Sequence, residues 1–339
     1  MVVMRKLCVS ALAVVMALTF TLVLTTSAGA KTTATPTSAR WERVSARSHP
    51  SARDSAASAY DAATGQLVVF GGETGGGLAL SDTWVWSESS WHEVTSRTHP
   101  PAVAGAAMAY DPKVHAVVLF GGEGQYGKLF SQTWLWSSSG WHLQQTASRP
   151  SGRAYPAMTY DTRTETVDLF GGFVGGSRQT SAQLWAWSAR GWRQLTQHGL
   201  PALAEASMVY DPVAGELLLQ GGVASDGIRT VGQTWVKDGT SSTWSSLGTG
   251  GPGDRAAAAS VYDPSLGGIV AFGGWLNYEA DARGTWLWAN SHWSKIATSV
   301  APPERSVAVM AFDDRDNAVI LFGGASTDLN PMSDQWELR

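Results

Sequence analysis

Four arginines occupy one position of a recurring Pro-x-x-Arg step and could bind a charged ligand. They are Arg53, Arg153, Arg255 and Arg305. Guanidinium groups bind carboxylates through paired hydrogen bonds, so this set, with Glu73 and Glu123 near it, could receive an anionic ligand. The alternative is internal pairing, with these two glutamates or with Asp82 and Asp334 as partners.

A second group of candidates is aromatic. Trp275 is the only one of 17 tryptophans outside the repeated positions described below. It is followed closely by Asn277 and Tyr278, and an aromatic ring beside amide and carboxylate groups suits stacking on a sugar or burying an apolar partner residue. The alternative is a structural tryptophan that closes one end of the scaffold. Tyr126 and Phe173 are further aromatic residues outside the repeated positions.

The sequence lacks the residue patterns expected of a metal site, a catalytic set or a nucleic-acid-binding surface. The seven histidines show no His-Glu-x-x-His spacing, and Cys8 is the only cysteine, so we expect no metal and no cofactor. No nucleophile, base and orienting group can be recognised, and we name no catalytic residue. With a formal net charge of −4 and no basic cluster, the chain lacks the marks of a nucleic-acid-binding protein.

A repeat of about 50 residues must position these candidates. A Tyr-Asp step, relaxed to Phe-Asp in the last copy, begins at positions 60, 110, 160, 210, 262 and 312. A double glycine begins at 71, 121, 171, 221, 273 and 323. A tryptophan follows at 84, 134, 185, 235, 286 and 336. The repeats lie near 50–94, 100–144, 150–195, 201–247, 252–297 and 303–339.

Each repeat predicts four short antiparallel strands. The first consists of small residues, as expected near the axis of a radial array, and the second is apolar at every position, as expected of a strand buried on both faces. The last repeat lacks its fourth strand, and Trp41 to Val44 match the missing piece. We therefore predict an all-β, six-bladed β-propeller over 41–339, with residues 41–44 completing blade 6 and removing the open sheet edge.

The N-terminal residues predict export. Arg5 and Lys6 precede an apolar run to Leu24, and small residues end at Ala30. This order is typical of a signal peptide (1–30) cleaved after Ala30, and residues 31–40 resemble a flexible linker. We expect a secreted or cell-envelope protein, monomeric, with no membrane span after cleavage.

The Gly-Gly, Thr-Trp and Pro-x-x-Arg steps resemble kelch repeats over residues 41–339. The most similar variety is that of the galactose oxidase central domain and of exported bacterial kelch proteins. Copper radical oxidases of this type need a cysteine cross-linked to a tyrosine, and the mature chain has no cysteine, so that activity is excluded. Kelch propellers serve as binding platforms and, less often, as enzymes.

Three functions remain open. The first is a recognition module that binds a glycan or a protein on the variable loops after the second strands, where ligand contacts usually lie. The second is an enzyme acting on a sugar acid, resembling the kelch-fold sialic acid mutarotases, with the glutamates and arginines as its groups. The third is a structural protein of the cell envelope. Without a recognisable catalytic set, we favour the first.

Overall fold

The computed structural model describes residues 39–339 except 176–177, 278–279 and 283. The described residues belong to one compact unit, Ser38–Arg339. The predicted signal peptide and residues 31–38 of the predicted linker lie outside them. Ala39 is buried in the core, and the backbone groups of Arg40 and Arg339 exchange hydrogen bonds of 2.8 and 3.1 Å. The folded unit therefore includes the last residues of the stretch that we expected to be a linker.

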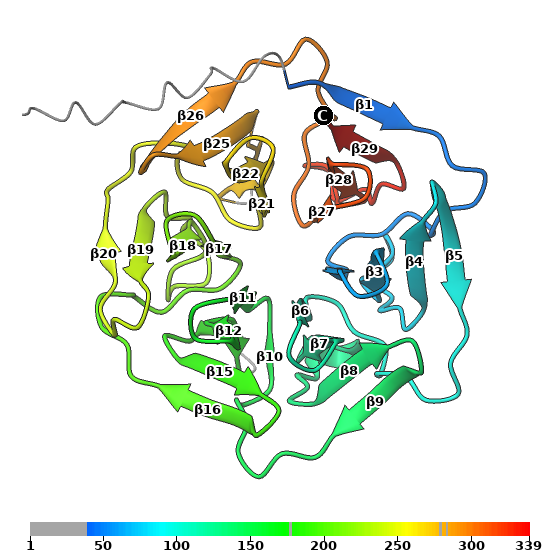
Figure 1. The fold of residues 1–339 in the computed structure, drawn as a ribbon, viewed down its shortest axis with the longest axis horizontal. Coiled ribbons are helices and arrows are strands. Elements are labelled where there is room, and N and C mark those ends of the chain that lie inside the picture. The colour runs from blue at the N-terminus through cyan, green and yellow to red at the C-terminus, as the bar shows by residue number, and fades with distance from the viewer. Residues whose placement is uncertain (1–38, 176–177, 278–279, 283) are drawn as a thin grey trace, which may run out of the picture. The chain divides into compact units, whose positions relative to one another are not determined.

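Six sheets of four antiparallel strands each are formed by the described residues, and they surround a central axis (Figure 1). Blade 1 contains β2 (Ala57–Asp61), β3 (Gln66–Phe70), β4 (Thr83–Ser87) and β5 (Ser90–Val94). Blade 2 contains β6 (Ala107–Asp111), β7 (Ala116–Phe120), β8 (Thr133–Ser137) and β9 (Gly140–Gln144). Blade 3 contains β11 (Ala157–Asp161), β12 (Thr166–Phe170), β15 (Leu184–Ser188) and β16 (Gly191–Leu195).

The remaining blades follow the same plan. Blade 4 contains β17 (Ser207–Asp211), β18 (Glu216–Gln220), β19 (Thr234–Asp238) and β20 (Ser245–Ser246). Blade 5 contains β21 (Ala259–Asp263), β22 (Gly268–Phe272), β25 (Thr285–Ala289) and β26 (His292–Ile296). Blade 6 contains β27 (Val309–Asp313), β28 (Ala318–Phe322), β29 (Gln335–Leu338) and β1 (Trp41–Val44). The predicted six-bladed, four-stranded propeller is confirmed.

The N-terminal strand closes the ring. Strand β1 pairs antiparallel with β29, with Trp41 opposite Leu338 and Val44 opposite Gln335. Blade 6 is thus built from both ends of the described chain, as the missing fourth strand of the last repeat predicted. This pairing leaves β29 with a partner on each side, so the sheet has no open edge at that strand.

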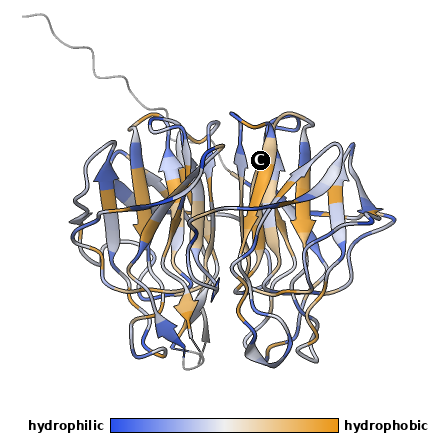
Figure 2. Ribbon diagram, turned by 90° about the horizontal axis from the view of Figure 1, so that it is seen from below, coloured by the Kyte–Doolittle hydropathy of each residue, from blue (hydrophilic) through white to orange (hydrophobic). Residues whose placement is uncertain are grey.

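The second strands are buried on both faces because neighbouring blades cover them. In blade 1, Leu67, Val68, Val69 and Phe70 are all fully buried. Leu67 and Val69 belong to a core cluster shared with blade 6, whereas Val68 and Phe70 belong to one shared with blade 2. Alternate side chains therefore pack against two different blades, and the apolar strands stand out in Figure 2.

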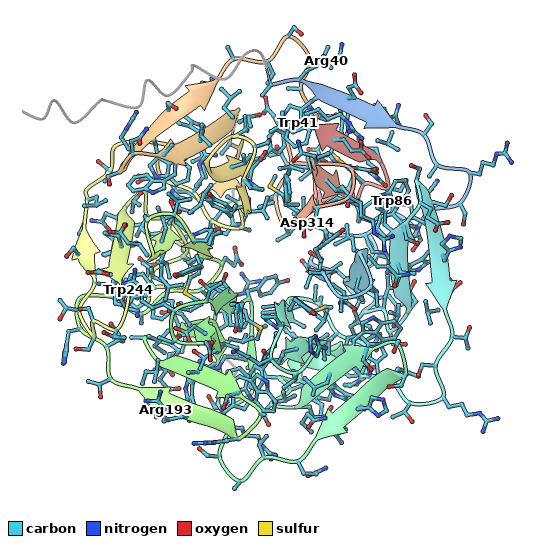
Figure 3. The ribbon with its side chains drawn as sticks, viewed as in Figure 1. Arg40, Trp41, Trp86, Arg193, Trp244 and Asp314 are labelled. Carbon is cyan, nitrogen blue, oxygen red and sulfur yellow. The ribbon has the colours of Figure 1, made fainter. Side chains whose placement is uncertain are left out.

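Tryptophans of the outermost strands join each blade to the preceding one. Their indole Nε1 groups donate to side-chain oxygens at the start of the preceding blade's third strand, in the pairs Trp41–Thr285, Trp91–Gln335, Trp141–Thr83, Trp192–Thr133 and Trp293–Thr234, at 2.7 to 2.9 Å. Trp244 lies in the equivalent place of blade 4 (Figure 3). Its Nε1 has no hydrogen-bond partner in the described part of the chain, because Leu184 occupies the acceptor position of blade 3.

Short elements outside the blades lie in or beside the loops after the second strands. Strands β10 (Arg153–Ala154), β13 (Phe173–Val174) and β14 (Gln179–Thr180) form a small sheet in blade 3. Strands β23 (Trp275–Leu276) and β24 (Ala280–Asp281) form a hairpin in blade 5, and a single 3-10 turn, η1 (Gln125–Gly127), lies in blade 2. None of the helical structure in the described residues is long or apolar enough for a membrane span.

Candidate functional site

Six residues, one from each blade, form a closed ring of backbone hydrogen bonds around the axis. They are Ser55, Gly105, Tyr155, Glu205, Ala257 and Val307. Each N–H donates to the carbonyl of the ring member in the preceding blade, and Ser55 donates to Val307, at 2.6 to 3.1 Å. We call this set the neck ring. It lies two residues after the Pro-x-x-Arg position in every blade.

All six members of the neck ring have left-handed backbone conformations, with φ between 48° and 61°. Five of them are not glycine, and such a residue costs about 1–2 kcal/mol in this conformation. The ring of hydrogen bonds holds them there. Backbone strain of this kind is typical of ligand-binding sites, where the surrounding structure over-determines the conformation. Only the side chains differ from blade to blade, so they define what the channel presents at this level.

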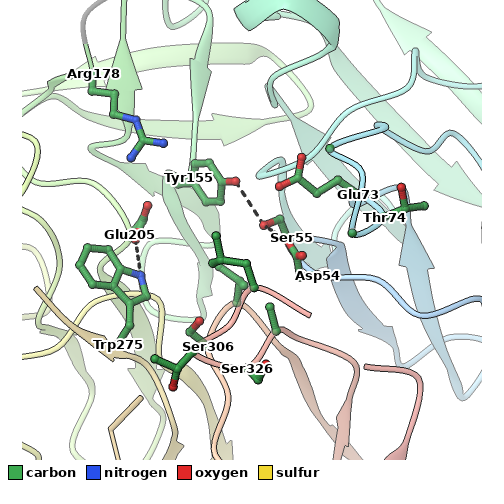
Figure 4. A pocket seen from close by; sticks show the side chains of 16 residues that line it. Asp54, Ser55, Glu73, Thr74, Tyr155, Arg178, Glu205, Trp275, Ser306 and Ser326 are labelled. Carbon is green, nitrogen blue, oxygen red and sulfur yellow. Dashed lines mark hydrogen bonds between the residues drawn. The ribbon is translucent and has the colours of Figure 1, made fainter. Parts of the chain in front are cut away.

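A pocket of about 300 Å³ lies at the mouth of the channel, beside the neck ring (Figure 4). We call it the channel-mouth pocket. Its polar and aromatic lining consists mainly of Asp54, Ser55 and Glu73 of blade 1, Tyr155 and Arg178 of blade 3, Glu205 of blade 4, Trp275 of blade 5, and Ser306 and Ser326 of blade 6. Five of the six blades therefore contribute to one cavity.

Tyr155 crosses the channel from blade 3 to blade 1. Its hydroxyl donates to Ser55 Oγ at 3.2 Å, and burial holds the pKa of Tyr155 well above its usual range, so the hydroxyl stays protonated. The ring lies against Gly105 of the intervening blade, where a Cβ atom would come within 2.8 Å of it. Phe173 packs edge-on against Tyr155, with 6.2 Å between the ring centroids. Gly105 thus makes room for the tyrosine that forms part of the pocket wall.

Glu205 faces Tyr155 and is held by Trp275. The indole Nε1 of Trp275 donates to Glu205 Oε2 at 2.9 Å. Burial raises the pKa of Glu205 to about 7, although the nearby charge of Arg178 and the bond from Trp275 both act to lower it. At neutral pH this carboxyl group is therefore populated in both protonation states, as is typical of a group that accepts and donates protons in a site.

Asp54 and Glu73 form the acidic wall of blade 1. Asp54 accepts a hydrogen bond of 2.7 Å from Ser55 Oγ at Oδ1, and burial raises the pKa of Asp54 despite that bond. Burial also raises the pKa of Glu73, and the negative charges of Asp54 and Glu123 raise it further. Both groups ionise with more difficulty than exposed carboxylates, so a ligand that donates hydrogen bonds or bears positive charge would stabilise them.

The four arginines of the Pro-x-x-Arg steps do not line the channel-mouth pocket. They are 0 to 3% exposed. Arg53 and Arg305 form two-pronged pairs with Asp82 and Asp334, at 2.7 to 2.9 Å. Arg153 donates to Gln183 Oε1 at 2.8 Å, and Arg255 donates to two backbone carbonyls. Internal hydrogen bonding is thus the alternative that the structure shows, and the expectation that these arginines receive a ligand is corrected.

Arg153 and Arg255 have no carboxylate at the position that Asp82 and Asp334 occupy for the other two arginines. Arg153 donates to the amide of Gln183, and in blade 5 the position of Asp82 and Asp334 is occupied by Gly284, which has no side chain. Burial then lowers the pKa of Arg153 and of Arg255 to about 10. Each of the four donates from Nη1 to the carbonyl of the first glycine of its own blade's Gly-Gly pair. They fix the scaffold beneath the neck ring.

The other predicted residues fall into two groups. Trp275, Phe173 and Glu73 lie at or beside the pocket. Asn277 instead accepts hydrogen bonds from the backbone N–H and the hydroxyl of Thr230 in the neighbouring loop, at 3.1 and 3.0 Å. Tyr126 is fully exposed at a loop tip and does not line the pocket, nor does Glu123. Tyr278 lies outside the described residues.

Sequence reasoning missed Asp54, Tyr155 and Glu205. The signal available was divergence at the neck-ring position, where the six repeats have Ser, Gly, Tyr, Glu, Ala and Val although the residues around them recur. In the described part of the chain, no three histidine, cysteine, aspartate or glutamate side chains are placed to hold an ion. The polar and aromatic groups that line the pocket are carboxylates, one phenol, an indole and the guanidinium of Arg178.

Comparison with known proteins identifies the fold. No family model matches the sequence, and neither does any curated protein. Among solved structures, that of a protein named YjhT is similar, with a TM-score of 0.66 over 86% of this chain and 95% of that one, at 14% identity. At such low identity the likeness shows the fold alone. It agrees with the sheet order described above, which is that of a six-bladed β-propeller.

Proposed function

We propose that this protein is an exported recognition propeller that binds a carbohydrate in the channel-mouth pocket. The supporting observation is that cavity of about 300 Å³, in which Trp275 and carboxylates of opposite blades face one space. Carboxylate oxygens accept hydrogen bonds from sugar hydroxyls, and an indole packs against the apolar face of a sugar ring. Export is proposed from the charged, apolar and small residues of positions 1–30.

The concave shape favours a small ligand over a protein surface. Stable protein interfaces need roughly 800 Å² on each partner, whereas this pocket has the size of a small-molecule site, for which about 300–1,000 Å³ is usual. A purely structural role gives no reason for carboxylates of raised pKa around a cavity. We therefore favour a glycan over a protein ligand and over the structural alternative.

Saturation-transfer NMR with a panel of monosaccharides tests this function on the chain from Lys31. We expect transfer from the protein to at least one sugar class. Trp275→Phe, which keeps an aromatic ring but removes the N–H group that holds Glu205, is expected to weaken binding about tenfold, the effect of about 1.4 kcal/mol. Tyr126→Ala is the matched control, since that aromatic side chain lies on the same face outside the pocket. Folded wild-type protein that binds no sugar would overturn the proposal.

The second candidate is an enzyme that moves protons on a sugar. One observation favours it, namely that Glu205 and Tyr155 line the same pocket, where burial raises the pKa of Glu205 to about 7. Opening a cyclic sugar needs one group to accept the proton of the anomeric hydroxyl and another to protonate the ring oxygen. A sugar acid would meet Arg178 but also the acidic wall of blade 1. Exchange NMR on the same samples tests this activity, because Glu205→Gln should abolish any acceleration of anomer interconversion.

A further inference from the structure

The charges of the channel-mouth pocket are distributed unevenly. Glu205 lies within the electrostatic influence of Arg178, whose positive charge offsets it in part. Asp54 and Glu73 are on the opposite blade, and the negative charges of Asp54 and Glu123 both act on Glu73. The unbalanced negative charge therefore lies on the blade 1 side, away from Arg178 (Figure 4).

The acidic wall also has unused hydrogen-bonding capacity. Asp54 is 9% exposed, and within the described residues its side chain has one hydrogen-bond partner, Ser55, at one of its two oxygens. Glu73 lines the same pocket and makes no side-chain hydrogen bond with any described residue. A carboxylate as buried as that of Asp54 normally has partners at both oxygens. Asp54 and the partly buried Glu73 instead leave acceptor positions that face the cavity.

We propose that the ligand has a protonated amine, and that this ammonium group binds between Asp54 and Glu73. This rests on the proposed carbohydrate function and narrows it to amino sugars. An ammonium group has three donors and no acceptor, which matches two acceptor-only carboxylates. Charge-assisted bonds of this kind are roughly twice as strong as neutral ones. A neutral hydroxyl at the same place would leave the two negative charges unopposed.

The orientation of the ligand follows from the same geometry. With the amine at blade 1, the sugar ring lies toward Trp275 and Glu205 on the far side of the pocket, where its hydroxyls can donate to Glu205. Glu205 then contributes to binding any sugar, whereas the acidic wall contributes to choosing an amino sugar. The two contributions can be separated by substitution.

Ligand-observed NMR titration at pH 7 with the chain from Lys31 tests the proposal. The probes are glucose, its 2-, 3- and 6-amino-deoxy derivatives, and glucuronate. We expect at least one amino derivative to bind about tenfold more tightly than glucose, the effect of one charge-assisted contact. Asp54→Asn and Glu73→Gln are each expected to reduce this ratio toward one. Asp328→Asn, which removes an exposed carboxylate of the same face, should leave the ratio unchanged.

Each other outcome has a definite meaning. If glucose binds as tightly as every amino derivative, the amine is excluded and the proposed carbohydrate function stands. If glucuronate binds most tightly, the acidic wall is not the recognition element and the sugar-acid alternative gains. A ratio that survives both Asp54→Asn and Glu73→Gln places the amine elsewhere and overturns the assignment. If no probe binds, the carbohydrate function fails together with this inference.

Discussion

Replacing Glu205 with glutamine should stabilise the protein at alkaline pH. The carboxyl group is held where burial raises its pKa from 4.5 to about 7. Between these two values the folded state keeps a proton that the unfolded state has released, so the free energy of unfolding falls as pH rises. Above about pH 7 the loss of folding stability caused by ionising the buried carboxyl group is complete. Below about pH 4.5 this loss vanishes because the carboxyl group is protonated in both the folded and the unfolded state.

The magnitude follows from the shift. A difference of about 2.5 pKa units corresponds to about 3 kcal/mol at 1.36 kcal/mol per unit. Glutamine removes this penalty and still offers an oxygen to the indole N–H of Trp275. The effects of that bond and of Arg178 are already contained in the net shift of the Glu205 carboxyl group, so no further loss is subtracted. We therefore expect Glu205→Gln to raise the free energy of unfolding by about 3 kcal/mol at pH 8.

Urea denaturation of wild type and variant at pH 5 and pH 8 measures this difference. The gain should be about 3 kcal/mol at pH 8 and much smaller at pH 5. Glu93→Gln is the control, since this glutamate is exposed on β5, away from the pocket. If Glu205→Gln gives no gain at pH 8, or the same gain at both pH values, the carboxyl group is not under the burial penalty described here. A confirmed gain would mark Glu205 as a residue kept for function at the expense of stability.

Two further substitutions test the scaffold. Thr285→Val removes the acceptor of the Trp41 indole N–H at the ring closure, where both residues are 1% exposed. It should reduce the free energy of unfolding, measured by urea denaturation, by about 1–3 kcal/mol. An unchanged denaturation midpoint would show that this hydrogen bond contributes nothing to stability. Gly105→Ala would place a Cβ atom 2.8 Å from the Tyr155 ring and should lower the free energy of unfolding by about 1–3 kcal/mol. In a Tyr155→Ala background the same change should cost less. Equal losses in both backgrounds would exclude the clash with the tyrosine ring as the cause.

The repeated residues determined the fold because their signals are local. A double glycine ends each second strand, a Tyr-Asp step ends each first strand, and an all-apolar run such as Leu67 to Phe70 needs cover on both faces. Six copies at a spacing of about 50 residues can satisfy these demands together only by packing against one another. The closing strand at 41–44 could be predicted in the same way, because the last repeat lacks a fourth strand and residues 41–44 match the missing one.

The sequence identified only part of the site. Trp275 stood out because it alone left the repeated positions, and it does line the pocket. Its contact with Glu205 was not predictable, since the two residues are 70 positions apart and in different blades. The arginines were misleading for the opposite reason. They are repeated because four of the six blades use an arginine to hold the Gly-Gly turn. Two of them also pair with carboxylates inside their own blades.

The sequence by itself determined a six-bladed β-propeller, its closing strand and the absence from the mature chain of the cysteine that copper radical chemistry needs. Only the tertiary structure decided that Ser55, Tyr155 and Glu205 share one channel mouth, that Tyr155 reaches across Gly105, and that Asp54 and Glu73 leave acceptor positions facing a cavity. The physical reason is that strand patterns depend on neighbours in the chain, whereas the pocket depends on single side chains that closure of the ring brings to a common axis.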